Sequence, residues 1–292
     1  MSDYKPNSAE IKELRAKTLA GFQDCQRALA EAKGDMTTAE EIIRKKGLQV
    51  AARKAHREAC EGLIAAKVDE GLASGAIVEV NTETDFAARN EEFRKLTCAL
   101  VDHVLGVGPD EITEGSELHE DTLHPHGGRT VKSVIDETIG KIGENMGLRR
   151  AVRFKAVSPG IVTSYIHPPG KIGVLLELGY EKGADKDKAA ELAHELALQI
   201  AFADPSYVVP EDIPETVLAK EREIAHEKAR EQGKPEHLVP KIAEGMLRKF
   251  YADECLLDQP YAKDPKSPVR DFIKRFGVPG ATVRRFVRFA LK

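Results

Sequence analysis

One segment of this 292-residue chain occurs twice, and the repeat limits the possible folds more than any other feature. Residues 62–105 read as a strand, a glycine turn, a second strand and an amphipathic helix, because alternating β-branched residues give way to apolar residues at helical spacing. Residues 160–203 repeat this order, and aligning Gly75 with Gly170 brings the apolar positions of both hairpins into register. The repeat predicts an α+β fold whose core contains two duplicated β-hairpin/helix subdomains.

Length and composition limit the function classes further. The chain is long enough for two or three domains, and 41% apolar and 32% charged residues suit a protein that folds in water. Its formal net charge of −4 offers no general attraction to nucleic acid or anionic lipid. The cysteines form no C-x-x-C pair, no apolar run approaches a membrane span, and the first residues lack a signal-peptide pattern. We therefore expect a cytoplasmic protein without a membrane or nucleic-acid partner.

Residues 1–47 read as a small domain of three short helices. The second helix is expected to end at Gly34, because glycine adopts a left-handed cap at little cost. A capping-box pattern at Thr37 predicts the start of the third helix, which we expect to stop at Gly47. Residues 48–60 are basic and lack a continuous apolar stripe, so we interpret them as a linker.

The rest of the chain divides into four segments. They are a first core subdomain at 61–151, a second core subdomain at 152–213, a projecting helical hairpin or coiled coil at 214–260, and a C-terminal segment at 261–292 that returns to the core. The hairpin is expected to turn at Gly233, Lys234 and Pro235. Within the first subdomain, residues 106–128 are rich in glycine, proline and acidic residues and have no period, which predicts a long solvated loop. A helix is expected to follow from about Thr130 to Met146.

The chain contains no catalytic signature. It lacks the phosphate-binding G-x-x-x-x-G-K-[ST] loop, the G-x-G-x-x-G turn, the G-x-S-x-G elbow and the H-E-x-x-H metal motif, so we expect neither an enzyme nor a cofactor. One cluster in the 106–128 loop has metal-ligating side chains: His119, Glu120, Asp121, His124 and His126. We expect no metal there, because a flexible loop supplies no supporting bonds around the ligands. A metal-dependent enzyme is the alternative.

The C-terminal segment is a basic region in an acidic chain. Arg284, Arg285 and Arg288 occur in a predicted strand, where we expect them to alternate toward solvent. The segment lacks the glycine-spaced aromatic pattern of an RNA-recognition sheet. We interpret it as a solvated edge strand.

The string Thr84–Asp85–Phe86 stands directly after the first hairpin, at the expected start of a helix. Thr84 is a good N-cap, and Asp85 complements the positive end of the helix dipole. Phe86 precedes Phe93 by seven residues, which on one helix is the same face. Phe86 is therefore either a core residue or an exposed aromatic anchor, and periodicity alone leaves both open.

A second unusual string, at 141–150, has the sequence KIGENMGLRR. It places Gly143 inside the expected helix, where glycine costs about 1 kcal/mol relative to alanine. Either close helix packing or the close approach of a partner should compensate for this cost.

Five strings follow one another along the chain. They are LRAKTLAGFQDCQRALAEAKGDMTTAEEIIRKKG, VEVNTETDFAARNEEF, KIGENMGLRRA, SYIHPPGKIGVLLEL and GKPEHLVPKIAEGMLRKF. Together they resemble the elongation factor Ts family of translation factors, and the resemblance covers nearly the whole chain.

The resemblance implies a fold and a function. The fold is an N-terminal ubiquitin-associated-like three-helix domain, two homologous α+β subdomains and a helical coiled-coil hairpin. The function is guanine-nucleotide exchange: a protein of this kind binds elongation factor Tu in its GDP-bound and nucleotide-free states, displaces its magnesium ion and promotes GDP release during translation elongation. A ubiquitin-type adaptor or chaperone-like interaction protein is the alternative.

The resemblance also implies which residues contact the partner. In the family, the Thr-Asp-Phe string inserts its aromatic ring into the GTPase domain of elongation factor Tu and dislodges the magnesium ion. The residues that match this string are Thr84, Asp85, Phe86 and Ala87. Further contacts are implied in the N-terminal domain, on the core helix near the Asp-Phe string and in the second hairpin loop: Arg15, Gly21, Phe22, Ile142, Gly143 and His167.

Overall fold

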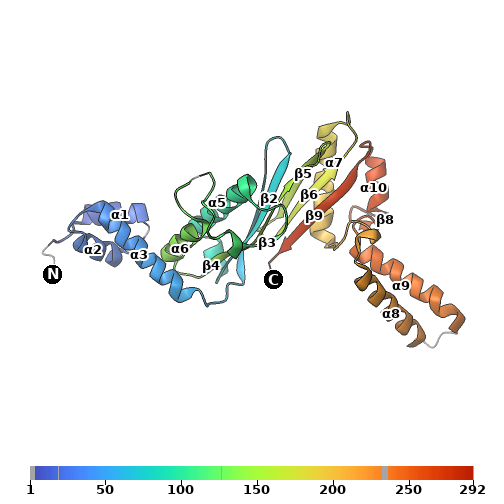
Figure 1. The fold of residues 1–292 in the computed structure, drawn as a ribbon, viewed down its shortest axis with the longest axis horizontal. Coiled ribbons are helices and arrows are strands. Elements are labelled where there is room, and N and C mark those ends of the chain that lie inside the picture. The colour runs from blue at the N-terminus through green and yellow to red at the C-terminus, as the bar shows by residue number, and fades with distance from the viewer. Residues whose placement is uncertain (1–3, 19, 126, 232–235, 292) are drawn as a thin grey trace.

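The computed structural model describes residues 4–18, 20–125, 127–231 and 236–291. The molecule is elongated, with a bundle of helices at the N-terminal end, two sheets with their helices in the middle, and a helical hairpin at the far end (Figure 1). Helices and antiparallel sheets occur in one chain, which confirms the predicted α+β class. In the described part of the chain, no helix combines the length and apolar character needed to span a membrane.

The N-terminal helices are α1 (Ser8–Thr18), α2 (Phe22–Glu31) and α3 (Met36–Lys54). They have a small core of their own: Ile11, Leu14, Cys25, Ala28, Leu29 and Ala39. Asp35, not Thr37, caps α3, because its carboxylate accepts a hydrogen bond from the Thr38 amide at 2.7 Å. The expected cap at Thr37 is therefore wrong.

Helix α3 also continues through Gly47 to Lys54, so the expected helix end at Gly47 and the expected linker at 48–60 are both wrong. Gly47 instead lies where α3 crosses α6 (Val131–Ile142), the helix that contains Gly140, at short distance. A Cβ atom placed on Gly140 would lie 2.7 Å from the Cα of Gly47. Beyond this crossing, Ala51 is buried in the core of the first sheet. The second half of α3 thus belongs to the body of the molecule.

The first sheet has the strand order β1-β2-β4-β3 and is antiparallel throughout. Its strands are β1 (Glu61–Val68), β2 (Ser74–Thr82), β3 (Thr113–Glu114) and β4 (Met146–Lys155). The helices of this half are α4 (Asp85–Ala88), α5 (Glu91–Val107) and α6 (Val131–Ile142). Apolar residues of α5 and α6 pack on one face of the sheet with those of β2 and β4. Since β4 pairs with β2 as far as Lys155, the expected subdomain boundary at 151/152 is wrong and falls inside a strand.

The second sheet has the order β5-β6-β9 and is covered by α7 and α10. These elements are β5 (Gly160–His167), β6 (Ile172–Gly179), α7 (Lys186–Ala203), α10 (Val269–Phe276) and β9 (Thr282–Ala290). The two sheets meet through a shared apolar layer: Ile64, Ile77, Val152, Phe154, Val162, Leu175, Val287 and Phe289. The duplicated hairpins therefore lie back to back, each with its helices on the outer face.

The third strand of each sheet is duplicated too. Residues 148–154 and 283–289 read LRRAVRF and VRRFVRF, a repeat that the hairpin comparison did not include. Glu79 on β2 and Glu177 on β6 are buried at matching bulges, and each is bound by two consecutive arginines of the adjacent third strand. The second arginine of each pair stacks on a phenylalanine of the other sheet: Arg150 on Phe289 at 4.1 Å and Arg285 on Phe154 at 4.2 Å.

β9 is an edge strand, as expected, but its arginines are paired with carboxylates instead of projecting freely into solvent. Arg284 and Arg285 bind Glu177 at 3.2 and 2.8 Å, and Arg288 binds Asp204 at 2.9 Å. Burial acts to raise the pKa of Glu177, but the Val157 amide and the two guanidinium groups together hold that pKa below its usual value. The alternation pattern was misleading because neither face of β9 is turned to solvent: Val283 packs with α7 and α10, and Val287 packs against the first sheet.

The 106–128 segment is largely exposed, as expected of a loop, but it is anchored to the body at several points. It contains β3 and the short helix η1 (Gly115–Leu118), and both Leu118 and Leu123 are buried. The buried ring of His103 accepts a hydrogen bond from the His124 amide at 3.1 Å and lies 3.3 Å from an Asp121 oxygen. Anchors of this kind are single and irregularly spaced, so no sequence period reveals them.

The helical hairpin consists of α8 (Glu215–Glu231) and α9 (Val239–Glu254), which lie side by side and extend away from the sheets (Figure 1). The expected turn at Gly233, Lys234 and Pro235 lies outside the described residues. Among the short elements, η2 (Pro210–Asp212) precedes α8, η3 (Glu236–Leu238) lies between the two arms directly before α9, and β7 (Pro260–Tyr261) and β8 (Asp264–Pro268) follow α9.

Candidate partner-binding site

Helix α4 is a single turn that presents Phe86 to solvent. The Phe86 side chain is 81% exposed, more than any other large apolar side chain in the described part of the chain. Its neighbours Ala87 and Ala88 are buried and attach the turn to the first sheet. The core interpretation of Phe86 is therefore wrong, and its role as an aromatic anchor stays a prediction. The seven-residue spacing to Phe93 carries no information because the helix breaks at Asn90, which caps α5.

Thr84 fixes the start of α4. Its hydroxyl oxygen accepts a hydrogen bond from the Ala87 amide at 3.2 Å, as expected of an N-cap. The same hydroxyl donates to Glu144 at 2.8 Å, and the Thr84 amide donates to the other Glu144 oxygen at 3.0 Å. Glu144 belongs to the turn between α6 and β4. Two segments that are 60 residues apart in sequence thus meet at the base of Phe86.

A second carboxylate makes the reverse connection. Glu83 accepts a hydrogen bond from the Asn145 amide at 2.6 Å and binds Arg57 at 3.2 Å. The Asn145 amide and the Arg57 guanidinium hold the pKa of Glu83 below its usual value. The Asn145 side chain in turn donates to the Arg57 carbonyl at 2.6 Å, and Lys54 donates to the Gly143 carbonyl. The ends of α3 and α6 and the start of α4 therefore form one hydrogen-bonded junction.

Gly143 ends α6 rather than lying inside it. Its φ of +83° is left-handed, and its amide donates to the Ile139 carbonyl, so it is the C-cap of a helix that stops at Ile142. The expected helix to Met146 is therefore too long, because Met146 already belongs to β4. Backbone conformation accounts for the glycine, since nothing lies within 4 Å of a Cβ placed there. The structure brings Ile142 and Gly143 next to the α4 junction.

The other residues implied by the resemblance lie elsewhere. Arg15 on α1 is exposed, as are Gly21 and Phe22 at the start of α2, and the Phe22 side chain is 49% exposed. His167 is exposed at the end of β5, and its Nδ1 lies 3.0 Å from the Tyr165 hydroxyl. Arg15, Gly21 and Phe22 belong to the helices at the N-terminal end of the molecule (Figure 1). His167 begins the loop after β5, in which the Gly170 carbonyl accepts a hydrogen bond from the Ile64 amide of β1.

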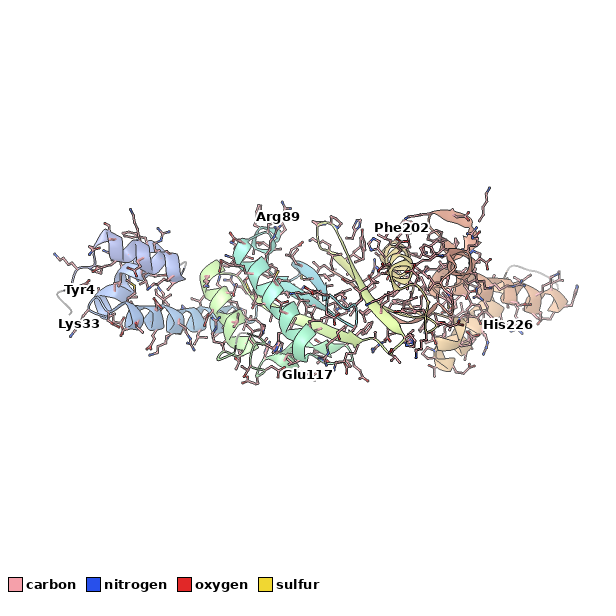
Figure 2. The ribbon with its side chains drawn as sticks, turned by 90° about the horizontal axis from the view of Figure 1, so that it is seen from above. Tyr4, Lys33, Arg89, Glu117, Phe202 and His226 are labelled. Carbon is pink, nitrogen blue, oxygen red and sulfur yellow. The ribbon has the colours of Figure 1, made fainter. Side chains whose placement is uncertain are left out.

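One exposed aromatic residue was missed. Phe202, near the end of α7, is 77% exposed and lines a hollow of about 470 Å³ with His167 and Tyr165. The helical spacing of α7 indicates this exposure. The buried residues Leu196 and Ile200 are four apart and lie on one face of the helix, and Phe202 lies off that face. Figure 2 shows Phe202 on the same side of the molecule as Arg89, which follows α4, with Glu117 on the opposite side. Glu83 and Glu144 were also missed, since no local pattern marks them.

The histidine-rich cluster does not converge on one point. Asp121 faces His103, and burial holds the pKa of His119 below its usual value. Across the part of the chain that the structure describes, no three His, Cys, Asp or Glu side chains are close enough to hold a metal ion. His126 lies outside the described residues.

Comparisons with known proteins agree with one another. A family model described as elongation factor TS matches residues 83–292. The elongation factor Ts of Aquifex aeolicus (strain VF5) is 45% identical over 284 residues, which cover 97% of this chain and 96% of that protein. The elongation factor Ts of Trichlorobacter lovleyi is 42% identical over 290 residues, covering 97% and 92%, and that of Clostridium perfringens (strain SM101 / Type A) is 42% identical over 283 residues, covering 96% and 90%.

Proposed function

The chain belongs to the elongation factor Ts family and is a translation elongation factor with a role in nucleotide exchange, and we propose that Phe86 is the side chain through which it acts on elongation factor Tu. Thr84, Asp85 and Ala87 would shape the contact around the ring. The consequence would be displacement of the magnesium ion of the partner and release of its GDP.

One observation carries the proposal: a large aromatic ring is exposed on a turn that is itself rigidly held. Burying an apolar ring in a partner is favourable, and aromatic side chains dominate the binding energy of protein interfaces. An anchor on a fixed base loses little further freedom on binding. Ala87 and Ala88 are buried and Thr84 is bonded to Glu144, so Phe86 meets this condition.

Binding can drive exchange only through differential affinity. If the chain binds the nucleotide-free partner more tightly than the GDP-bound partner, GDP must by linkage bind the complex more weakly in the same proportion. A ring that occupies space near the phosphates and the magnesium ion would supply this difference. This activity requires no bond-making chemistry, so we propose that the chain is not an enzyme and needs no cofactor.

Further contacts are proposed on the same basis. Arg15, Gly21 and Phe22 would contact the nucleotide-binding domain of elongation factor Tu from the N-terminal helices, which we interpret as the ubiquitin-associated-like domain. Ile142 and Gly143 would support the Phe86 contact. His167, on the second of two homologous subdomains, would meet another domain of the partner. The α8/α9 hairpin would be the coiled coil of the family, and the cytoplasm would be the site of action.

The test is the release of fluorescent GDP from elongation factor Tu with and without this protein. Phe86→Ala should lower the rate enhancement by about 30-fold, which corresponds to the loss of about 2 kcal/mol at an interface anchor. Because the ring is exposed, the substitution should change the free energy of unfolding of the protein by less than about 0.5 kcal/mol. Ile112→Ala, which removes another exposed apolar side chain, is the matched control. It should accelerate GDP release from elongation factor Tu as much as the parent protein does.

Two results would contradict this proposal. Full activity of Phe86→Ala would remove the ring from the exchange mechanism. Unchanged GDP release with the parent protein would instead favour the adaptor alternative.

A further inference from the structure

We infer that Glu144 is a positioning residue for exchange: it holds helix α4 so that Phe86 keeps the orientation in which it meets the partner. The inference rests on the proposed function of Phe86. Glu144 itself need not touch the partner, because its role is exerted through Thr84.

The contacts of Glu144 are directed at one element. Its carboxylate accepts hydrogen bonds from the Thr84 amide at 3.0 Å, the Thr84 hydroxyl at 2.8 Å and the Thr82 hydroxyl at 3.4 Å. The Thr84 oxygen that donates to Glu144 also accepts from the Ala87 amide at 3.2 Å. A continuous chain of hydrogen bonds therefore leads from Glu144 to the residue after Phe86.

Helix α4 needs such support. It has four residues, and a single turn fixes many backbone angles for few hydrogen bonds, so it is unstable by itself. On its exposed face, Asp85 forms an ion pair with Arg89 at 3.0 Å, and such surface pairs contribute little. The bonds to Glu144 act at the first residue of the turn and are charge-assisted, which makes them stronger than neutral ones.

Glu83 supports the same joint from the opposite side. Glu144, on the α6–β4 turn, accepts from the amide of Thr84, while Glu83, at the end of β2, accepts from the amide of Asn145. Each segment thus caps a backbone amide of the other. Glu144 is the residue assigned to positioning because its bonds reach the N-cap of α4, whereas Glu83 is also bound to Arg57.

The first measurement uses the free protein and does not depend on the partner. Hydrogen exchange of the amides of residues 87–90, which are hydrogen-bonded in the turn, should become at least fivefold faster in Glu144→Ala. It should change less in Glu144→Gln, whose side-chain oxygen can still accept from the Thr84 amide. Asp185→Ala is the matched control, because Asp185 caps α7 by accepting from the amides of Asp187 and Lys188. This control should leave the hydrogen exchange of the α4 amides unchanged. Unchanged hydrogen exchange of the α4 amides in Glu144→Ala would overturn the inference.

The second measurement is a double-mutant cycle in GDP release from elongation factor Tu. Glu144→Ala should lower the rate enhancement at least fivefold, Glu144→Gln should restore part of it, and Asp185→Ala should have no effect. Glu144→Ala combined with Phe86→Ala should be no worse than Phe86→Ala alone, since Glu144 acts through the ring. Effects that multiply would assign Glu144 a role unrelated to Phe86 and overturn the inference. Full activity of Phe86→Ala would refute the proposed function instead. The hydrogen-exchange measurement alone would then decide whether Glu144 holds α4 in place.

Discussion

At the scale of single residues, the surroundings decide what a side chain does. Phe86 and Phe93 are seven positions apart, yet the first is exposed and the second is fully buried. They belong to different helices, and the break between them at Asn90 is made by one side-chain cap. A periodicity argument holds only within an uninterrupted helix, so the identity of residue 90 matters as much as the spacing.

His103 shows the same dependence on surroundings and predicts a pH effect. Burial lowers the pKa of His103, although Asp121 partly opposes this shift. The unfolded chain therefore takes up a proton more readily than the folded protein, and stability should fall as the pH drops below about 6.5 toward the folded pKa. The loss should be at most about 1.4 kcal/mol for each pH unit from this residue.

Urea unfolding at pH 7.5 and pH 5.5 would measure the effect. His103→Gln should lose less stability than the parent between these two values, because it removes the titrating group. An equal loss in both proteins would show that His103 does not contribute.

At the scale of elements, the crossing of α3 and α6 depends on glycine. A Cβ on Gly140 would lie 2.7 Å from the Cα of Gly47, which is backbone and can move only with its helix. We predict that Gly140→Ala lowers the free energy of unfolding by about 1–3 kcal/mol through overpacking. Gly245 lies in α9 with nothing within 4 Å of its Cβ position, so Gly245→Ala should raise stability by up to about 1 kcal/mol. Thermal unfolding of both variants tests the contrast, and a stabilised Gly140→Ala protein would contradict the crossing.

At the scale of the whole molecule, the N-terminal helices have a core of their own but are joined rigidly to the body. Helix α3 spans both, with Ala39 in the N-terminal core and Ala51 in the core of the first sheet. Deleting residues 1–35 should therefore weaken the association with elongation factor Tu and leave the melting temperature of the body nearly unchanged. Deleting residues 1–54 should also lower that melting temperature by several degrees, because buried apolar contacts are lost. Equal melting temperatures for the two truncated proteins would contradict this prediction, because they would place the boundary after Ala51.

The sequence by itself determined the elements that depend on local pattern. The repeated hairpin and helix predicted the α+β class and the two related halves, because strand alternation and helical spacing report on neighbours within a few residues. The resemblance of the Thr84–Ala87 string to a known family indicated the candidate contact. An available signal was overlooked: the repeat of LRRAVRF and VRRFVRF would have identified the matching third strands.

Only the tertiary structure decided how these elements meet. The exposure of Phe86, the continuation of α3 through Gly47, the packing of residues 106–128 and the bonds from Glu144 to Thr84 all depend on segments far apart in sequence. The local sequence around a glycine does not show whether that glycine ends a helix or permits a close helix crossing. Nor does the local sequence around a glutamate show whether its side chain is solvated or caps a distant turn. These outcomes follow from which surfaces are brought together on folding, and no local period records that.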